Sequence, residues 1–177
     1  MNTKNLVLMA LLVGVGAALY LMIPGFSGGI KPDFMLTMMF IGIILFPKAS
    51  HVFLLALTTG VISGLFSTFP AGFIPNVVDK FVTAFVFFAV VVALKQFTSK
   101  LPIVIILAGL GTFLSGVTFL SIAIFVFRVD VGIPFSGLVL GAVLPAVAMN
   151  AIAFFFIFPI VTKLVKRSKF ETALTSS

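Results

Sequence analysis

The chain has 177 residues, of which 62% are hydrophobic and 8% are charged, and its formal net charge is +7. This composition, with a mean hydropathy of +1.37, excludes an ordinary soluble domain. The 11 Lys and Arg residues are spread over gaps between apolar runs. This distribution indicates that the cations orient the chain in a membrane and contact anionic lipid, and it argues against nucleic-acid binding. The absence of cysteine excludes disulfides and thiolate metal sites, and we expect no cofactor.

Long apolar runs predict an all-α polytopic membrane protein with six transmembrane helices in one compact bundle. Because backbone in lipid must satisfy its own hydrogen bonds, each run should form a helix. Pro145 and Pro159 lie within the last run and predict kinks there. The whole chain, residues 1–177, is therefore predicted to be a single membrane domain. The predicted spans are 6–23, 33–46, 51–69, 77–94, 103–127 and 134–162, and a basic tail follows over 163–177.

The charged residues in the gaps differ between the two sides of the predicted bundle. On one side they are mostly basic, which indicates the cytoplasm and places both termini there. On the other side each cation lies within two residues of an acid. The basic side carries Lys4, Lys48, Lys95, Lys100, Lys163, Lys166, Arg167 and Lys169, and the other carries Lys31 with Asp33, Lys80 with Asp79, and Arg128 with Asp130.

Several kinds of chemistry find no support in the sequence. No ionisable residue is expected near the middle of a span, which argues against proton-coupled transport. No G-x-x-x-x-G-K-[ST] loop is present, so the chain does not use ATP by that route. His51, the single histidine, is predicted to be solvated or to face lipid headgroups at the start of the third span. We therefore expect a protein that is not an enzyme and has no energy source of its own.

Three small residues in the first span recur at four-residue spacing. Ala10, Gly14 and Ala18 lie on one stripe of that predicted helix. Small residues let membrane helices approach closely. The stripe therefore predicts either packing within the bundle or an interface with a partner protein.

The paired charges on the non-cytoplasmic side form a candidate binding site. Asn76 and Lys80 share a helix face, and Asp79 lies beside them. A zwitterionic amino acid needs an acceptor for its ammonium and donors for its carboxylate, and acid–base pairs supply both. The alternative is that each pair only caps a helix end. Apolar residues suited to an aromatic side chain surround the pairs: Phe34, Met35, Met38, Met39, Phe66, Phe69, Phe73 and Phe81.

Asn150 is the one strongly polar side chain predicted deep within the sixth span. It either bonds between helices or forms the floor of the site.

The segments from Gly28 to Asp33 and from Phe69 to Lys80 resemble the tryptophan transporter family TrpP, a family of substrate-binding (S) components of energy-coupling factor transporters. The likeness extends over essentially the whole chain. It implies a bacterial plasma-membrane protein that captures L-tryptophan at the outer face. It further implies association with a transmembrane coupling subunit and two cytoplasmic ATPases. The A-x-x-x-A pattern that contacts the coupling subunit in this class maps onto Ala10 and Gly14, with Gly in the second position.

On this resemblance, Asp79 or Asp33 would accept from the ligand ammonium. Lys80, Lys31 or Arg128 would hold its carboxylate, and Asn76 would orient the head group. Three rival interpretations remain at this stage. These are a standalone ion-coupled transporter of tryptophan or another aromatic nutrient, an S component for a different aromatic ligand, and a membrane assembly or signalling partner without a small ligand.

Overall fold

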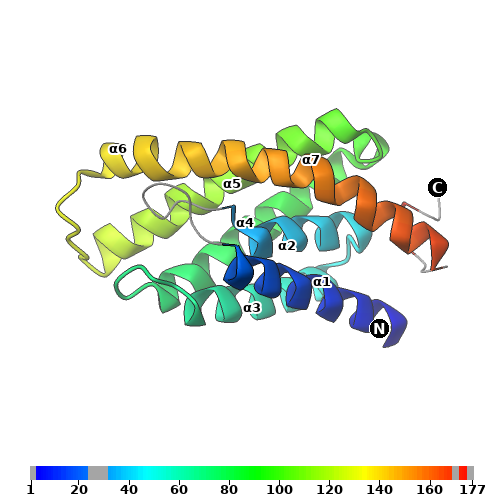
Figure 1. The fold of residues 1–177 in the computed structure, drawn as a ribbon, viewed down its shortest axis with the longest axis horizontal. Helices are drawn as coiled ribbons and strands as arrows, with labels where there is room; N and C mark the ends of the chain where they lie inside the picture. Colours follow the sequence, from blue (N-terminus) through cyan, green and yellow to red (C-terminus); the bar gives the residue numbers. More distant parts are fainter. Residues whose placement is uncertain (1–2, 24–31, 169–171, 175–177) are drawn as a thin grey trace.

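The computed structural model describes residues 3–23, 32–168 and 172–174, and within these ranges every regular element is a helix. The helices form an elongated bundle in which α1 begins, and α7 ends, at the same end of the molecule (Figure 1). Lys31, a predicted site residue, lies outside the described residues. The α-helices are α1 (Thr3–Met22), α2 (Phe34–Leu45), α3 (Ala49–Leu65), α4 (Phe73–Ala93), α5 (Leu101–Ser121), α6 (Phe135–Leu138) and α7 (Leu144–Arg167), and π-helical turns η3 (Ile122–Val126) and η4 (Val139–Val143) follow α5 and α6.

Four helical segments are long and apolar enough to cross a membrane: Thr3–Met22, Phe73–Ala93, Leu101–Val126 and Phe135–Arg167. Helices α2 and α3 are apolar but shorter, with 12 and 17 residues. At a rise of about 1.5 Å per residue, α2 extends over about 18 Å of a hydrocarbon core about 30 Å thick. The structure thus supports a polytopic membrane protein, while the six-span arrangement and the orientation of the termini stay predictions.

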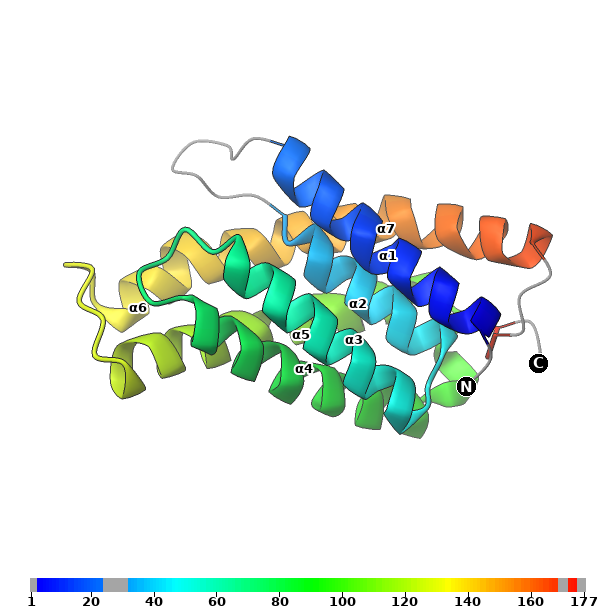
Figure 2. The same cartoon turned by 90° about the horizontal axis from the view of Figure 1, so that it is seen from below.

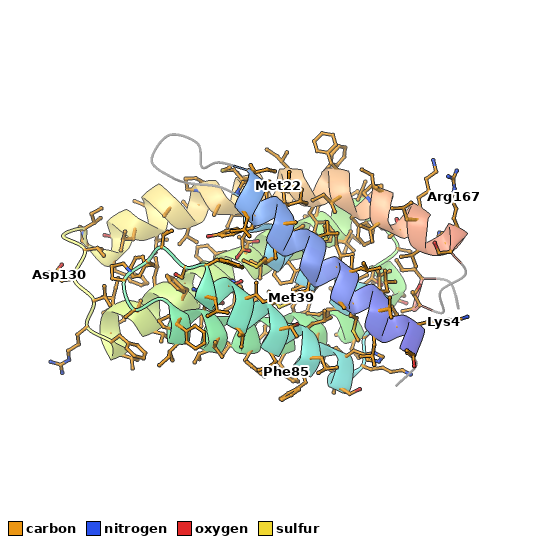
Figure 3. The ribbon with its side chains drawn as sticks, turned by 60° about the horizontal axis from the view of Figure 1, so that its bottom comes forward. Lys4, Met22, Met39, Phe85, Asp130 and Arg167 are labelled. Carbon is orange, nitrogen blue, oxygen red and sulfur yellow. The ribbon has the colours of Figure 1, made fainter. Side chains whose placement is uncertain are left out.

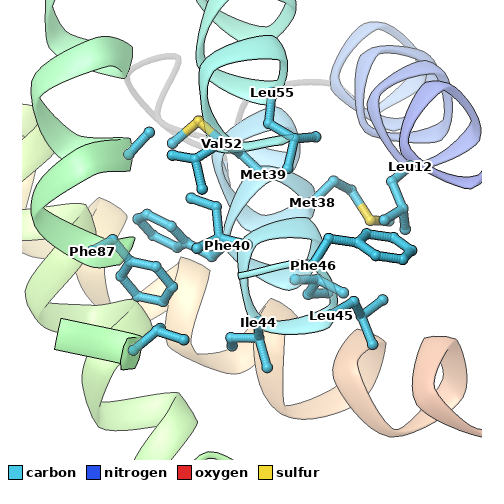
Figure 4. Close-up of a cluster of buried hydrophobic side chains, with 14 of the residues drawn as sticks. Leu12, Met38, Met39, Phe40, Ile44, Leu45, Phe46, Val52, Leu55 and Phe87 are labelled. Carbon is cyan, nitrogen blue, oxygen red and sulfur yellow. The ribbon is translucent and has the colours of Figure 1, made fainter. Parts of the chain in front are cut away.

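Helix α2 lies inside the bundle rather than at its surface (Figure 2). All 12 of its residues are buried, which explains why it is apolar on every side. It packs against α1, α3, α4 and α7, and the ring of Phe40 stacks on Phe87 of α4 at a centroid distance of 4.1 Å (Figure 4). At its far end, the N–H of Ala173 donates to the carbonyl of Leu45. The short second run is therefore a central helix surrounded by its neighbours.

Helix α4 begins at Phe73, four residues before the predicted start at 77. Pro75 is tolerated in the first turn because the N–H that it lacks would have no partner within the helix. The Asn76 side chain donates from Nδ2 to the carbonyl of Gly72 at 2.8 Å and so supports this start. The predicted loop through Asn76 is wrong, and the polar residues of this segment belong to a continuous helix.

The two prolines of the last predicted span occupy different positions in the helix. Pro145 stands in the first turn of α7, directly after the π-helical turn η4. A wider turn there accommodates a residue that cannot donate to the preceding turn. Pro159 lies inside α7.

The prediction for His51, at the start of α3, is also wrong. His51 is buried, with its ring centroid 5.7 Å from that of Phe46, and is not solvated.

Candidate functional site

A cavity of about 250 Å³ opens at the end of the bundle where α2 and α4 begin. The elements that line it are the last turns of α1 and α3, the α3–α4 loop, the first turns of α2 and α4, and the last two turns of α5. Its lining residues are Tyr20, Asp33, Met35, Ser63, Ser67, Thr68, Phe69, Asn76, Asp79, Lys80, Ser115, Gly116 and Phe119.

Lys80 is the centre of the polar network in this cavity. Its Nζ lies 2.8 Å from Oδ2 of Asp79 and 3.1 Å from Oδ2 of Asp33. It also donates to Oγ of Ser115 at 3.2 Å. Lys80 is 3% exposed and Asp79 is 1% exposed. Charges buried this deeply require paired partners, and here the partners come from α2, α4 and α5.

The two aspartates have different environments. Asp79 is saturated with donors, because Oδ1 accepts from Thr83 at 2.9 Å and Oδ2 accepts from both Lys80 and Ser115. Asp33 caps α2 by accepting from the N–H of Leu36 at 2.9 Å. Its side chain is 28% exposed, so Asp33 is the carboxylate that remains accessible from the cavity.

Asn150 joins three helices behind the cavity. Its Oδ1 accepts from the N–H of Asp33 at 2.7 Å, and its Nδ2 donates to Oγ1 of Thr112 at 3.1 Å. Thr112 donates in turn to the carbonyl of Ala108. Of the two sequence-based interpretations, the structure shows the bond between helices. Asn150 thereby fixes the backbone position of Asp33.

The structure brings together five of the predicted site residues, Asp33, Met35, Asn76, Asp79 and Lys80, at the cavity wall. Three others lie elsewhere. Met38 is buried and lines a separate groove between α1 and α7. Phe73 is 44% exposed and lies against Gly64 of α3. Arg128 is exposed, with φ of +52°, after η3, where a left-handed residue ends a helix. Of the wider apolar set, Phe69 also lines the cavity.

Sequence reasoning missed the contribution of α5. Ser115 completes the network around Lys80, and Phe119 forms part of the cavity wall. A signal for this face was present, because Thr112 and Ser115 are three residues apart in a mostly apolar run and so share a helix face. Tyr20, at the end of α1, was also missed.

Aromatic and apolar side chains form one side of the cavity. The rings of Phe69 and Phe119 meet edge to face at a centroid distance of 5.3 Å. The Met35 sulfur, which is polarizable, accepts from the Ser63 hydroxyl at 3.7 Å. The cavity thus combines a charged wall with an aromatic one.

The charged wall carries a net negative charge, because two aspartates face one lysine. Such a wall suits a ligand with a cationic group, and Lys80 adds a donor for an anionic group nearby. Among the described residues no group of three or more His, Cys, Asp or Glu side chains is placed to hold a metal ion. The arrangement can bind a small zwitterion, because it offers an acceptor for an ammonium and a donor for a carboxylate.

The small residues of the first helix lie at the surface of the bundle. Ala10, Gly14 and Ala18 are exposed. Ala10 and Gly14 line a groove of about 370 Å³ between α1 and α3, and a Cβ added at Gly14 would meet nothing within 4 Å. The stripe is therefore exposed along its length, and the space beside Gly14 is open.

Comparison with known families and proteins gives a consistent result. The model of the family described as "Tryptophan transporter TrpP" matches residues 2–166. The chain is 46% identical to the "Probable tryptophan transport protein" of Bacillus subtilis (strain 168), covering 98% of this chain and 99% of that protein. It is 37% identical to the protein of the same name from Clostridium acetobutylicum, covering 92% and 94%. No solved structure matches the chain.

Proposed function

Because the chain belongs to the tryptophan transporter TrpP family, which is a family of transporters and not of enzymes, we propose that it binds L-tryptophan in the cavity beside Asp33 and Lys80. The observation that carries this proposal is the Lys80–Asp33 ion pair, whose acid is accessible from the cavity. The cavity of about 250 Å³ lies just below the range of about 300–1,000 Å³ for drug-sized ligands. It suits one free amino acid better than a peptide.

In this proposal the ligand enters between the two members of the ion pair. The ligand ammonium binds Asp33, and the ligand carboxylate takes the Lys80 donor that otherwise faces Asp33. Lys80 and Asp33 each exchange one opposite charge for another, so neither charge is left uncompensated. Asp79 and Ser115 hold Lys80 in place on its other side.

The aromatic wall then receives the indole. Phe69 and Phe119 already meet edge to face. The indole, as a third aromatic ring, can pack against them in the same favourable geometry. Tyr20 and Met35 complete this side of the cavity.

The proposal is tested by titrating L-tryptophan into the purified chain. The protein contains no tryptophan, so the ligand is the only indole present, and its emission shift and anisotropy report binding. D-tryptophan, tyrosine and nicotinic acid serve as competitors. The proposal predicts saturable, stereoselective binding. Folded protein that shows no saturable change with L-tryptophan would contradict it.

We further propose that the chain acts as an S component, which captures L-tryptophan at the outer face and delivers it with a transmembrane coupling subunit and two ATPases. Two observations support this mode. The sequence contains no P-loop, and the exposed stripe Ala10, Gly14 and Ala18 offers a surface on which a partner helix could pack closely. Uptake into liposomes would then require the coupling module and ATP.

One observation favours a second candidate, a standalone ion-coupled transporter. The sequence-based argument against it was that no ionisable residue lies near the middle of a predicted span. In the structure Asp79 and Lys80 are buried inside α4, and Asp79 lies about 9 Å along this helix from its first residue. Buried ionisable groups at such depth are a feature of ion-coupled transport. Uptake by the purified chain alone, driven by a proton or sodium gradient, would establish this candidate and exclude the S-component mode.

A further inference from the structure

An apolar groove of about 500 Å³ runs along the outside of the bundle between α1 and α7. Both helices pack on α2, and Met38 of α2 is one of the lining residues between them. Leu11 of α1 and Ile160 and Leu164 of α7 line the groove and are 56%, 59% and 57% exposed. In a bilayer such a groove faces lipid. Its apolar walls match a hydrocarbon chain lying along the two helices.

Positive charge is concentrated at one end of this groove. Lys163, Lys166 and Arg167 are exposed in the last turns of α7. Arg167 is three residues beyond Leu164, so the two side chains are neighbours on the helix surface. Figure 3 shows Lys4 of α1 at the same end of the bundle as Arg167. Neither α1 nor α7 contains an acidic residue, so these helices offer no competing negative charge.

We propose that the α1–α7 groove is a binding site for an anionic phospholipid. One acyl chain lies along the groove between Leu11 and Ile160, and the phosphate lies among the cations at the end of α7. A basic cluster beside helices at the level of the headgroups attracts anionic lipid, and the adjoining groove selects a lipid over a soluble phosphate. This inference is independent of the substrate proposed for the cavity.

The absence of tryptophan from the chain provides a test. In the variant Leu11→Trp, the single indole lies in the groove and reports contact with brominated acyl chains by quenching. Vesicles keep one fixed mixture of phosphatidylglycerol and phosphatidylcholine, and only the lipid that carries the bromine changes. The matched control Phe85→Trp places the indole on α4, where Phe85 is 38% exposed. Ile160→Trp provides a second reporter on the opposite wall.

We expect brominated phosphatidylglycerol to quench the Leu11→Trp and Ile160→Trp reporters at least about threefold more than brominated phosphatidylcholine does at equal mole fractions. The Phe85→Trp reporter should show no such preference. Adding Lys163→Gln and Arg167→Gln to the Leu11→Trp protein should abolish the preference. Adding Lys95→Gln and Lys100→Gln, which neutralises two exposed lysines between α4 and α5, should leave it intact.

The proposal is overturned if both groove reporters show the same ratio as Phe85→Trp, because the enrichment would then be general. It is equally overturned if the preference survives the neutralisation of Lys163 and Arg167. Since all the substituted side chains are at least one-third exposed, these variants should retain the fold.

Discussion

The Lys80 ammonium lies 3.1 Å from the Asp33 carboxylate and joins the first residues of α2 to α4. Lys80 is buried, whereas Asp33 faces the cavity. The pair thus connects the interior of the bundle with the space in which we propose that the ligand binds. Because α2 is surrounded by other helices, a change at this pair would act on the central element of the fold.

Asp33→Asn should weaken L-tryptophan binding, because the neutral amide cannot neutralise the ligand ammonium. We expect the Kd to rise at least about tenfold, equivalent to about 1.4 kcal/mol or more. Arg128→Gln is the matched control, since Arg128 carries charge at the same end of the bundle but is exposed and lies outside the cavity wall. Its Kd should stay within about twofold of the original. Equal effects of the two substitutions on the Kd would refute the assigned role of Asp33.

Asp79 and Lys80 should behave as a coupled pair in folding. Removing one member leaves a buried charge without its partner, which costs about 3–5 kcal/mol. Asp79→Asn and Lys80→Met should each lower the free energy of unfolding in mixed micelles, and the double variant should lose less than the sum of the two. Additive losses would show that the pair does not interact as the 2.8 Å distance indicates.

Asn150→Ala should affect binding through the backbone of Asp33. The substitution removes the acceptor for the Asp33 N–H, and an unsatisfied buried group costs about 1–3 kcal/mol. We expect both a lower unfolding free energy and a weaker Kd. Asn150→Asp keeps an acceptor for that N–H and tests whether the acceptor alone is sufficient. If Asn150→Ala left the Kd unchanged, the position of Asp33 would not depend on this bond.

Gly14→Leu should separate binding from transport. A Cβ at Gly14 meets nothing within 4 Å, so the variant should fold and bind L-tryptophan normally. A bulky side chain in the α1 stripe should block close approach of a partner helix and abolish uptake with the coupling module. Gly141→Leu is the matched control, because Gly141 is also open to its surroundings, and it should transport normally. Full uptake by Gly14→Leu would exclude this stripe as the coupling surface.

The sequence predicted the helical class. It also located six helical segments of the described residues, with α6, η4 and α7 counted as the one segment Phe135–Arg167, because a long apolar run in a membrane forms a helix. It misjudged the start of α4, because Pro75 was interpreted as part of a loop although the first helical turn tolerates it. That error hid the depth of Asp79 and Lys80. The charged wall was predicted from its own residues, whereas Ser115 and Phe119 depend on how α5 packs against α4, which sequence spacing does not reveal.

In the proposed complex the ligand zwitterion binds between Asp33 and Lys80. The most direct measurement compares the affinities of L-tryptophan, tryptamine and indole-3-propionate for the purified chain, because the two analogues lack the carboxylate and the ammonium, respectively. We expect each analogue to bind at least about tenfold more weakly than L-tryptophan, and Asp33→Asn to abolish the preference for L-tryptophan over indole-3-propionate. Affinity for either analogue equal to that for L-tryptophan would contradict this binding mode.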